Sequence, residues 1–167
     1  MKKKKLFKGK NFDVSSYEFS ISGKKVQHEI IEQNSAAAIL AIEKNKIIMI
    51  RQFRYPHKQV LEIPAGIRKK NETSLNCAKR ELLEETGYKS DNLLYLGIGR
   101  LMINRTNSIQ HLFVAKDAMK VSNPKEKNIK VIKITQNKLF DLITKDKFVQ
   151  LSGQGLILKY LIHNKKI

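Results

Sequence analysis

A single domain of the α/β or α+β class is the fold that the sequence predicts, and three observations lead to it. The 167 residues are enough to enclose one sizeable hydrophobic core. Short apolar segments typical of strands are interrupted by segments with the spacing of helices. No internal repeat or low-complexity linker divides the chain, so these strands and helices are expected to share one core.

The first third of the chain is predicted to hold a small subdomain of its own. Residues 1–11 are rich in lysine, and we expect them to form a flexible basic N-terminus. Residues 12–34 are expected to form an N-terminal β subdomain. Apolar and polar residues alternate over 17–21, a turn is expected at 22–24, and an extended pattern resumes over 26–31.

The remaining residues, 35–167, are predicted to form the main domain. Its first hairpin joins strands over 36–42 and 47–53, both apolar enough to lie at the centre of a sheet. A short strand over 60–63 leads into Pro-Ala-Gly and a helix. Further strands are expected over 93–98, 109–115 and 129–134. Two helices are expected near the end of the chain: one begins after Thr135, and the other covers about 154–163.

The helix near the middle of the chain carries the most informative residues. Its expected first residue follows an N-cap at Thr73 or Ser74, and Gly87 is a natural stop. At about 100° per residue, Leu75, Ala78 and Leu82 share one apolar stripe. The helix is therefore predicted to pack that stripe on the core and to present its other side elsewhere.

Three glutamates, Glu81, Glu84 and Glu85, lie on an arc about 100° wide beside this stripe, and we refer to them as the acidic arc. Carboxylates so close repel one another, and a divalent cation would reverse that effect. Oxygen ligands suit Mg²⁺ or Mn²⁺. Glu72 and Arg80 can bridge the preceding loop to the helix, which would hold Gly66 against the arc. The segment is therefore predicted to form a metal site.

The formal net charge of +18 raises the question of a nucleic-acid partner. Lysine outnumbers arginine 27 to 6, and the lysines are spread over both termini and the loops. Arginine is the residue preferred for bidentate phosphate recognition. The composition thus favours a solvated basic surface that attracts anionic substrates over a dedicated nucleic-acid site.

The rest of the composition narrows the class of protein. One cysteine, Cys77, excludes a disulfide framework within one chain and fits a reducing, cytoplasmic location. We expect Cys77 to be a packing residue. No signal peptide and no membrane span are expected, because no run of 18 apolar residues occurs. The four histidines have no spacing that predicts a metal site.

Residues 66–88 have the spacing of a sequence motif known as the Nudix box. The matching residues are Gly66, Glu72, Arg-Glu-Leu at 80–82, Glu84-Glu85, Gly87 and Tyr88. By this motif the chain resembles the Nudix hydrolases. RQFRYP at 51–56 and LEIPAG at 61–66 resemble the ADP-ribose pyrophosphatase branch. The resemblance implies an α/β/α sandwich around a mixed β-sheet. It also implies a homodimer that exchanges the N-terminal β subdomain.

The resemblance implies a reaction as well: metal-dependent hydrolysis of the pyrophosphate of a nucleoside diphosphate linked to another moiety, with ADP-ribose the leading substrate and Mg²⁺ or Mn²⁺ the cofactor. Glu81, Glu85 and the Ala65 carbonyl would bind metal, and Glu84 would ligate metal or orient a water on it. Arg80 would support the arc.

Candidate substrate contacts come from the neighbouring motifs by the same resemblance. Arg54 would contact the pyrophosphate or the terminal ribose. Arg51 is a second candidate whose alternative is an exposed charge at a strand end, and Glu62 either contacts substrate or supports its neighbours.

Two departures from the branch pattern leave the substrate open. The branch's S-P-G-x-S-x-E segment is replaced by residues 102–108, where Arg105 and Asn107 can contact phosphate or sugar instead. The loop expected to supply a general base offers Glu126 between two lysines. Alternative functions are a Nudix pyrophosphatase acting on NADH, a GDP- or UDP-sugar, a flavin dinucleotide or capped RNA, and a non-catalytic module that binds RNA or senses ADP-ribose.

Overall fold

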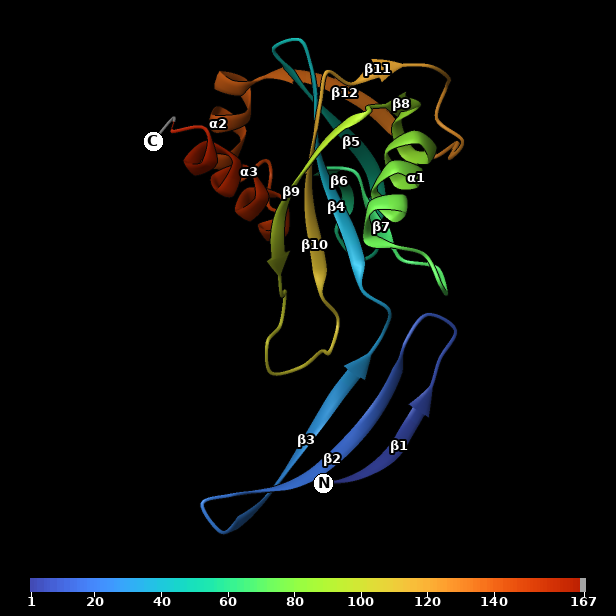
Figure 1. Cartoon of the computed structure of the whole chain (residues 1–167), viewed down its shortest axis with the longest axis vertical. Coiled ribbons are helices and arrows are strands. Elements are labelled where there is room, and N and C mark those ends of the chain that lie inside the picture. Colours follow the sequence, from blue (N-terminus) through green and yellow to red (C-terminus); the bar gives the residue numbers. More distant parts are fainter. Residues whose placement is uncertain (166–167) are drawn as a thin grey trace.

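The computed structural model describes residues 1–165 and shows a small sheet that extends away from a larger α/β body (Figure 1). The elements follow in the order β1 (Lys2–Lys8), β2 (Asp13–Ile21), β3 (Lys24–Glu32), β4 (Ala36–Glu43), β5 (Lys46–Arg54), β6 (Lys58–Glu62), β7 (Ala65–Ile67), α1 (Ser74–Thr86), β8 (Tyr88–Lys89), β9 (Asn92–Gly99), β10 (Gln110–Lys116), β11 (Met119–Lys120), β12 (Lys130–Thr135), α2 (Gln136–Thr144) and α3 (Leu151–His163).

The main sheet is mixed, and strand β4 lies near its centre. The strand order is β12-β5-β4-β10-β9, with β6 added to β5 and β7 added to β4. Strands β4 and β10 are parallel, whereas the other pairs are antiparallel. Strand β5 pairs with the end of β4, and β7 pairs with its beginning at Ala36–Ala38. This arrangement brings the residues that precede α1 to the middle of the sheet.

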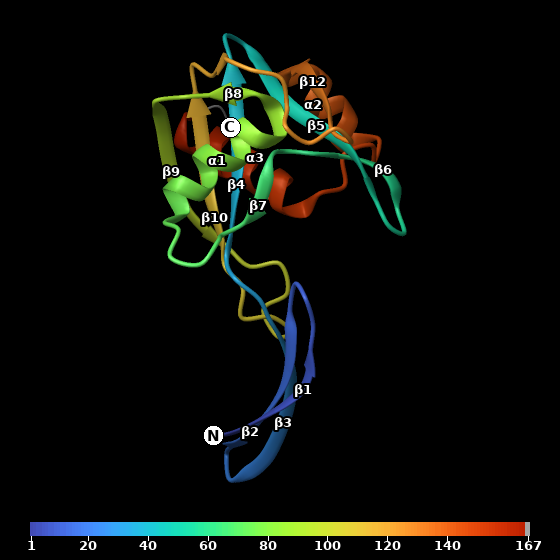
Figure 2. The same ribbon diagram turned by 90° about the vertical axis from the view of Figure 1, so that its right-hand side faces the viewer.

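Helices cover both faces of this sheet. Alternate residues of β4 enter two separate hydrophobic clusters, so Ala37 and Ile39 alternate with Ala38 and Leu40. Helix α1 packs on the first cluster, whereas α2 and α3 pack on the second (Figures 1 and 2). The predicted α/β/α sandwich around a mixed sheet is therefore confirmed.

The N-terminal sheet has the strand order β1-β2-β3 and extends away from the body (Figure 2). We expected residues 1–11 to be flexible, but residues 2–8 form a strand paired with β2. Two of the lysines find acidic partners across the sheet: Lys3 pairs with Glu32 of β3 at 2.6 Å, and Lys5 pairs with Asp13 of β2 at 2.5 Å. Backbone pairing thus prevails over an unfavourable composition.

The two sheets are joined at a neck, formed by residues 31–35 and 105–109. The Ile31 amide donates to the Arg105 carbonyl at 2.8 Å, and the Asn107 amide donates to the Ile31 carbonyl at 3.3 Å. The Ala36 amide donates to the Ile109 carbonyl at 2.8 Å, where β4 begins. The loop between β9 and β10 therefore supports the connection between the sheets.

The predicted helices are present, with small differences at their ends. Thr73 caps α1 through its side chain, and Gly87 ends α1 in the left-handed conformation. Helix α3 begins at Leu151, earlier than the predicted Gln154. Its first turn includes Gly153, where a side chain would collide with the Phe148 ring. None of the helices within residues 1–165 is long and apolar enough to cross a membrane.

Candidate active site

The segment before α1 comes close to that helix because one of its residues has no side chain. Strand β7 places Gly66 opposite Ala37 of β4. A Cβ atom on Gly66 would lie 2.0 Å from the carboxyl carbon of Glu81. One residue earlier, the Ala65 amide donates a hydrogen bond of 2.9 Å to Oε2 of Glu85. Glycine at 66 therefore allows the backbone to lie directly against two glutamates of the acidic arc.

Helix α1 buries two of the three glutamates of the acidic arc. Glu81 and Glu85 are 7% and 4% exposed, whereas Glu84 is half-buried. The apolar stripe contributes Ala78 and Leu82 to the core. Leu75 was predicted to share that stripe, but it is 40% exposed because the first turn of α1 extends past the edge of the core. Glu81 and Glu85 thus face the Ala65–Gly66 backbone, whereas Glu84 stays partly open to solvent.

Arg80 connects the helix, the loop and the acidic arc. Its Nε and Nη2 donate to the two carboxylate oxygens of Glu72 at 2.7 and 2.9 Å. Its Nη1 donates to Oε1 of Glu81 at 2.5 Å and to Oε2 of Glu84 at 3.1 Å, and Nη2 also reaches the Ile67 carbonyl at 3.2 Å. The bridge expected from the sequence between Glu72 and Arg80 is present.

The pKa values of these carboxyls differ because the carboxyls differ in burial and in their interaction with Arg80. Burial raises the pKa of Glu85 to about 8, and the charges of Glu81 and Glu126 act in the same direction. Burial also raises the pKa of Glu81, against the opposing effect of Arg80. Burial alone would raise the pKa of Glu84, but Arg80 lowers it below its ordinary value. Glu85 is therefore the carboxyl that the fold holds at the greatest electrostatic cost.

The hydrogen bonds of the arc determine which oxygens remain for a cation. Within the described part of the chain, no group of three His, Cys, Asp or Glu side chains is arranged as a metal site. The cause is that Arg80 draws Glu81 and Glu84 toward itself. Oε2 of Glu81 and Oε1 of Glu85 make no hydrogen bond to any residue from 1 to 165. These two oxygens and the adjoining backbone form an all-oxygen donor set that fits Mg²⁺ or Mn²⁺.

The loop of residues 121–128 lies along the C-terminal end of α1. The Lys125 amide donates to the Glu84 carbonyl at 2.8 Å, and its ammonium lies 3.5 Å from Oε1 of Glu84. Glu126 is exposed, and its charge raises the pKa values of Glu81 and Glu85. The loop thus brings Glu126 into electrostatic range of the arc. The involvement of Lys125 had no signal in the sequence.

Strands β5 and β6 bring together one predicted pair of residues and separate another. Arg54 Nε donates to Oε2 of Glu62 at 3.1 Å, and Gln52 Nε2 donates to the same oxygen at 2.7 Å. The Arg54 charge also acts to lower the pKa of Glu85, against the larger effect of burial. Arg51 lies on the opposite face of β5 from Gln52 and Arg54. It is exposed and makes no ion pair among residues 1–165.

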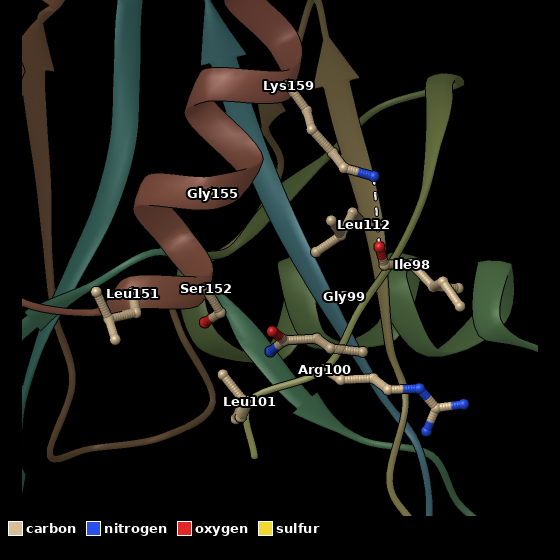
Figure 3. A pocket seen from close by; sticks show the side chains of 10 residues that line it. Ile98, Gly99, Arg100, Leu101, Leu112, Leu151, Ser152, Gly155 and Lys159 are labelled. Carbon is tan, nitrogen blue, oxygen red and sulfur yellow. Dashed lines mark hydrogen bonds between the residues drawn. The ribbon is translucent and has the colours of Figure 1, made fainter. Parts of the chain in front are cut away.

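Arg105 and an apolar hollow beside α3 lie away from the acidic arc. Arg105 is exposed at the neck, where its carbonyl accepts from the Ile31 amide. A hollow of about 250 Å³ lies between the start of α3 and the ends of β9 and β10, beside Leu112 and Gly155 (Figure 3). Lys159 crosses it to donate to the Leu96 and Ile98 carbonyls. None of the predicted site residues lines this hollow.

Cys77 lies beside the site without taking part in it. It is fully buried in the cluster beneath α1, as predicted for a packing residue. Burial raises the pKa of its thiol to about 11, and the charges of Glu72 and Glu81 add to this effect. A thiol held protonated at neutral pH is a poor nucleophile. The chemistry of the site is therefore carboxylate chemistry.

Comparisons with known proteins agree with this geometry. The model of the NUDIX domain family matches residues 32–150. The ADP-ribose pyrophosphatase of Bacillus subtilis strain 168 is 34% identical over 127 residues, which are 74% of this chain and 69% of the relative. The methanol dehydrogenase activator of Bacillus methanolicus is 33% identical over 146 residues, covering 84% of this chain and 78% of the relative.

A solved structure described as an ADP compounds hydrolase has the same fold. It superposes with a TM-score of 0.85 at 20% identity and covers 100% of this chain and 95% of its own. The superposition therefore includes the N-terminal sheet as well as the sandwich. Because the family model covers most of the chain and includes the arc, the loop before it and Arg80, the chain belongs to the Nudix hydrolase family.

Proposed function

We propose that the chain hydrolyses the pyrophosphate bond of a nucleoside diphosphate linked to another moiety, with ADP-ribose as the favoured substrate and AMP and ribose 5-phosphate as products. The observation that carries this proposal is the burial of Glu81 and Glu85 against the Ala65–Gly66 backbone. The relative named ADP-ribose pyrophosphatase supports the choice of substrate.

Nudix hydrolases generally use divalent metal ions, and we propose Mg²⁺ or Mn²⁺ here. Glu81, Glu84, Glu85 and the Ala65 carbonyl would hold the ion. Two buried carboxyls with raised pKa values repel each other, and a cation would relieve that repulsion. When bound, the ion would neutralise charge on the pyrophosphate and lower the pKa of water.

The neighbouring residues have separate tasks in this proposal. Arg80 holds Glu81 and Glu84 in place and ties both to Glu72. Glu126 is the candidate general base, because its loop is fixed to the end of α1 and its charge acts on the arc. A water between Glu126 and the phosphorus would give up its proton to this carboxylate as its oxygen bonds to the phosphorus, while the bridging P–O bond breaks and the other phosphate group leaves with the bridging oxygen.

Substrate binding falls to the β5–β6 hairpin and to the neck. Arg54 is half-exposed, and its guanidinium keeps free hydrogens for a phosphate or a ribose while Glu62 orients it. Glu62 is itself held by Gln52. Arg51 and Arg105 are distant from the arc within one chain, and we propose them as substrate contacts only where a second chain adds to the site.

A homodimer is part of the proposal because the N-terminal sheet has no core of its own. A three-stranded sheet needs a packed face to be stable. Here Phe7, Phe12 and Ile21 are about half exposed. A second copy is the partner that would cover them. The single buried cysteine fits a cytoplasmic location, which we also propose.

The test is an activity screen in Mg²⁺ and in Mn²⁺ with products identified by mass. The panel holds ADP-ribose, NADH, GDP- and UDP-sugars, flavin dinucleotide and capped RNA. Turnover of ADP-ribose to AMP and ribose 5-phosphate, lost in Glu85→Gln, is the expected result. Preference for another member of the panel would replace the substrate. Binding without turnover of any member would instead indicate a non-catalytic module.

A further inference from the structure

A second hollow, of about 360 Å³, lies where the neck meets the loop that follows β7. We call it the neck hollow. Three consecutive basic residues, Arg68, Lys69 and Lys70, line it. Asn34 and Asn107, which carry amide side chains, line it as well. No aspartate or glutamate lines it. The hollow is therefore surrounded by positive charge and by neutral hydrogen-bonding groups.

The three cations of the neck hollow form no ion pair within residues 1–165, although the Lys69 charge acts at longer range to lower the pKa of Glu84. Within residues 1–165, no carboxylate lies within 4.0 Å of the charged groups of Arg68, Lys69 or Lys70. The nearest acid in sequence, Glu72, spends both carboxylate oxygens on Arg80 and on the Lys69 amide. Three adjacent cations without a partner raise the local positive potential, which attracts an anion.

Hydrogen bonds hold the walls of the neck hollow in place. The Arg68 guanidinium donates through Nε and Nη2 to the Glu72 carbonyl at 2.9 and 2.5 Å, so its Nη1 group remains available. The Arg68 amide donates to the Ser35 carbonyl at 2.8 Å, and Asn34 Nδ2 donates to the Arg68 carbonyl at 3.1 Å. Asn107 Oδ1 accepts from the Gln33 amide at 3.2 Å. This leaves the Asn107 Nδ2 group free to donate.

We propose that the neck hollow binds a phosphate group. A guanidinium, two ammonium groups and a carboxamide donor match a dianion with several acceptor oxygens, and a fixed guanidinium is suited to bidentate phosphate binding. The phosphate has two sources: free inorganic phosphate, or an additional phosphomonoester on a dinucleotide substrate. This inference goes beyond the proposed hydrolysis, because phosphate binding requires no turnover.

The first experiment measures binding of inorganic phosphate to the full chain by calorimetry at constant ionic strength. The test variant is Lys69→Gln/Lys70→Gln, whose side chains are both exposed. The matched control is Lys24→Gln/Lys25→Gln, an adjacent exposed lysine pair at the far turn of the N-terminal sheet. We expect saturable binding that weakens about tenfold in the test variant and stays unchanged in the control.

The second experiment separates the two sources of phosphate. KM is measured for a dinucleotide that the enzyme turns over and for the same dinucleotide carrying one additional phosphomonoester. We call the ratio of the first KM to the second the KM preference for the phosphorylated compound. If the substrate supplies the phosphate, the test variant lowers the KM preference for the phosphorylated compound about tenfold. If free phosphate is the ligand, the KM preference stays constant while phosphate binding is weakened.

The proposal fails if the test variant keeps the wild-type KM preference and phosphate either does not bind saturably or binds the test variant like wild type. The titration does not depend on activity. An inactive protein that binds phosphate in the neck hollow would therefore overturn the proposed hydrolysis and leave this inference standing.

Discussion

Glu85→Gln should raise the stability of the metal-free protein and abolish its activity. The carboxyl has an ordinary pKa of 4.5 in the unfolded chain and a pKa of about 8 in the fold, where it is buried. At pH values between these two, the unfolded state releases a proton that the folded state keeps. Wild-type stability therefore falls as the pH rises through this window, whereas glutamine, which does not titrate, is unaffected.

The size of the effect follows from the same two values. One pKa unit corresponds to about 1.4 kcal/mol, so a pKa raised by about 3.5 units would cost about 5 kcal/mol above pH 8. The variant should exceed wild type by about 1 kcal/mol near pH 5.5, about 3 kcal/mol near pH 7 and about 5 kcal/mol near pH 8.5. Glutamine can still accept the Ala65 amide through its carbonyl oxygen, so that hydrogen bond is retained.

The assay is urea unfolding of both proteins at these three pH values in EDTA, repeated with Mg²⁺. Mg²⁺ should stabilise wild type and leave the variant unchanged, because the ion binds the ionised carboxylate. Turnover should fall about a thousandfold in the variant. A stability difference that does not change between pH 5.5 and 8.5 would refute the burial argument. Wild-type turnover would refute the catalytic role.

Three further changes test the site, and a fourth, Gly155→Ala, serves as a control. Gly66→Ala should lower both turnover and stability, since its Cβ would displace the Glu81 carboxylate, whereas Gly155→Ala, where nothing lies within 4 Å, should raise stability by up to about 1 kcal/mol by urea unfolding. Arg80→Lys should lower stability by about 2–4 kcal/mol and weaken Mg²⁺ binding in a titration, because lysine cannot reach Glu72 and the arc together; unchanged binding would contradict the positioning role. Arg54→Ala should raise KM about tenfold with little change in thermal stability, as its side chain is half-exposed, and an unchanged KM would remove it from the substrate site.

Much of the sandwich could be predicted because its signals are local. Thr73 and Gly87 supply cap chemistry that needs no knowledge of the rest of the chain, and both end α1 as expected. The apolar run of β4 indicated a strand buried on both faces, and the structure confirms it. Strand β1 was missed because lysines disfavour strands and the stabilising partner, β2, acts through pairing.

The same distinction applies to the site. Glu72, Arg80 and the acidic arc share one short segment, so helical spacing placed Arg80 near the arc, and the short loop before α1 kept Glu72 within its reach. The ion pair of Lys125 with Glu84 joins residues 41 positions apart, and only the path of the loop creates it. Leu75 has the helical angle of the apolar stripe but is exposed. Its burial depends on how far the sheet extends under the first turn of α1, which the helical angle does not determine. Resemblance to the branch favoured Arg54 over Arg51 as a substrate contact, and strand alternation turns the two side chains to opposite faces of β5.

The contact between Gly87 and the loop of residues 121–128 has a consequence for motion. The Gly87 carbonyl accepts from the Val121 and Ser122 amides at 2.9 and 3.1 Å, and Ser122 leaves no space for a side chain at 87. Because the Lys125 amide also bonds to the Glu84 carbonyl, a loop that lifted away would leave the carbonyls at the end of α1 without these partners, which would weaken the last helical turn. Local unfolding of these two segments is thus one cooperative event, and their amides should exchange with deuterium at a common rate.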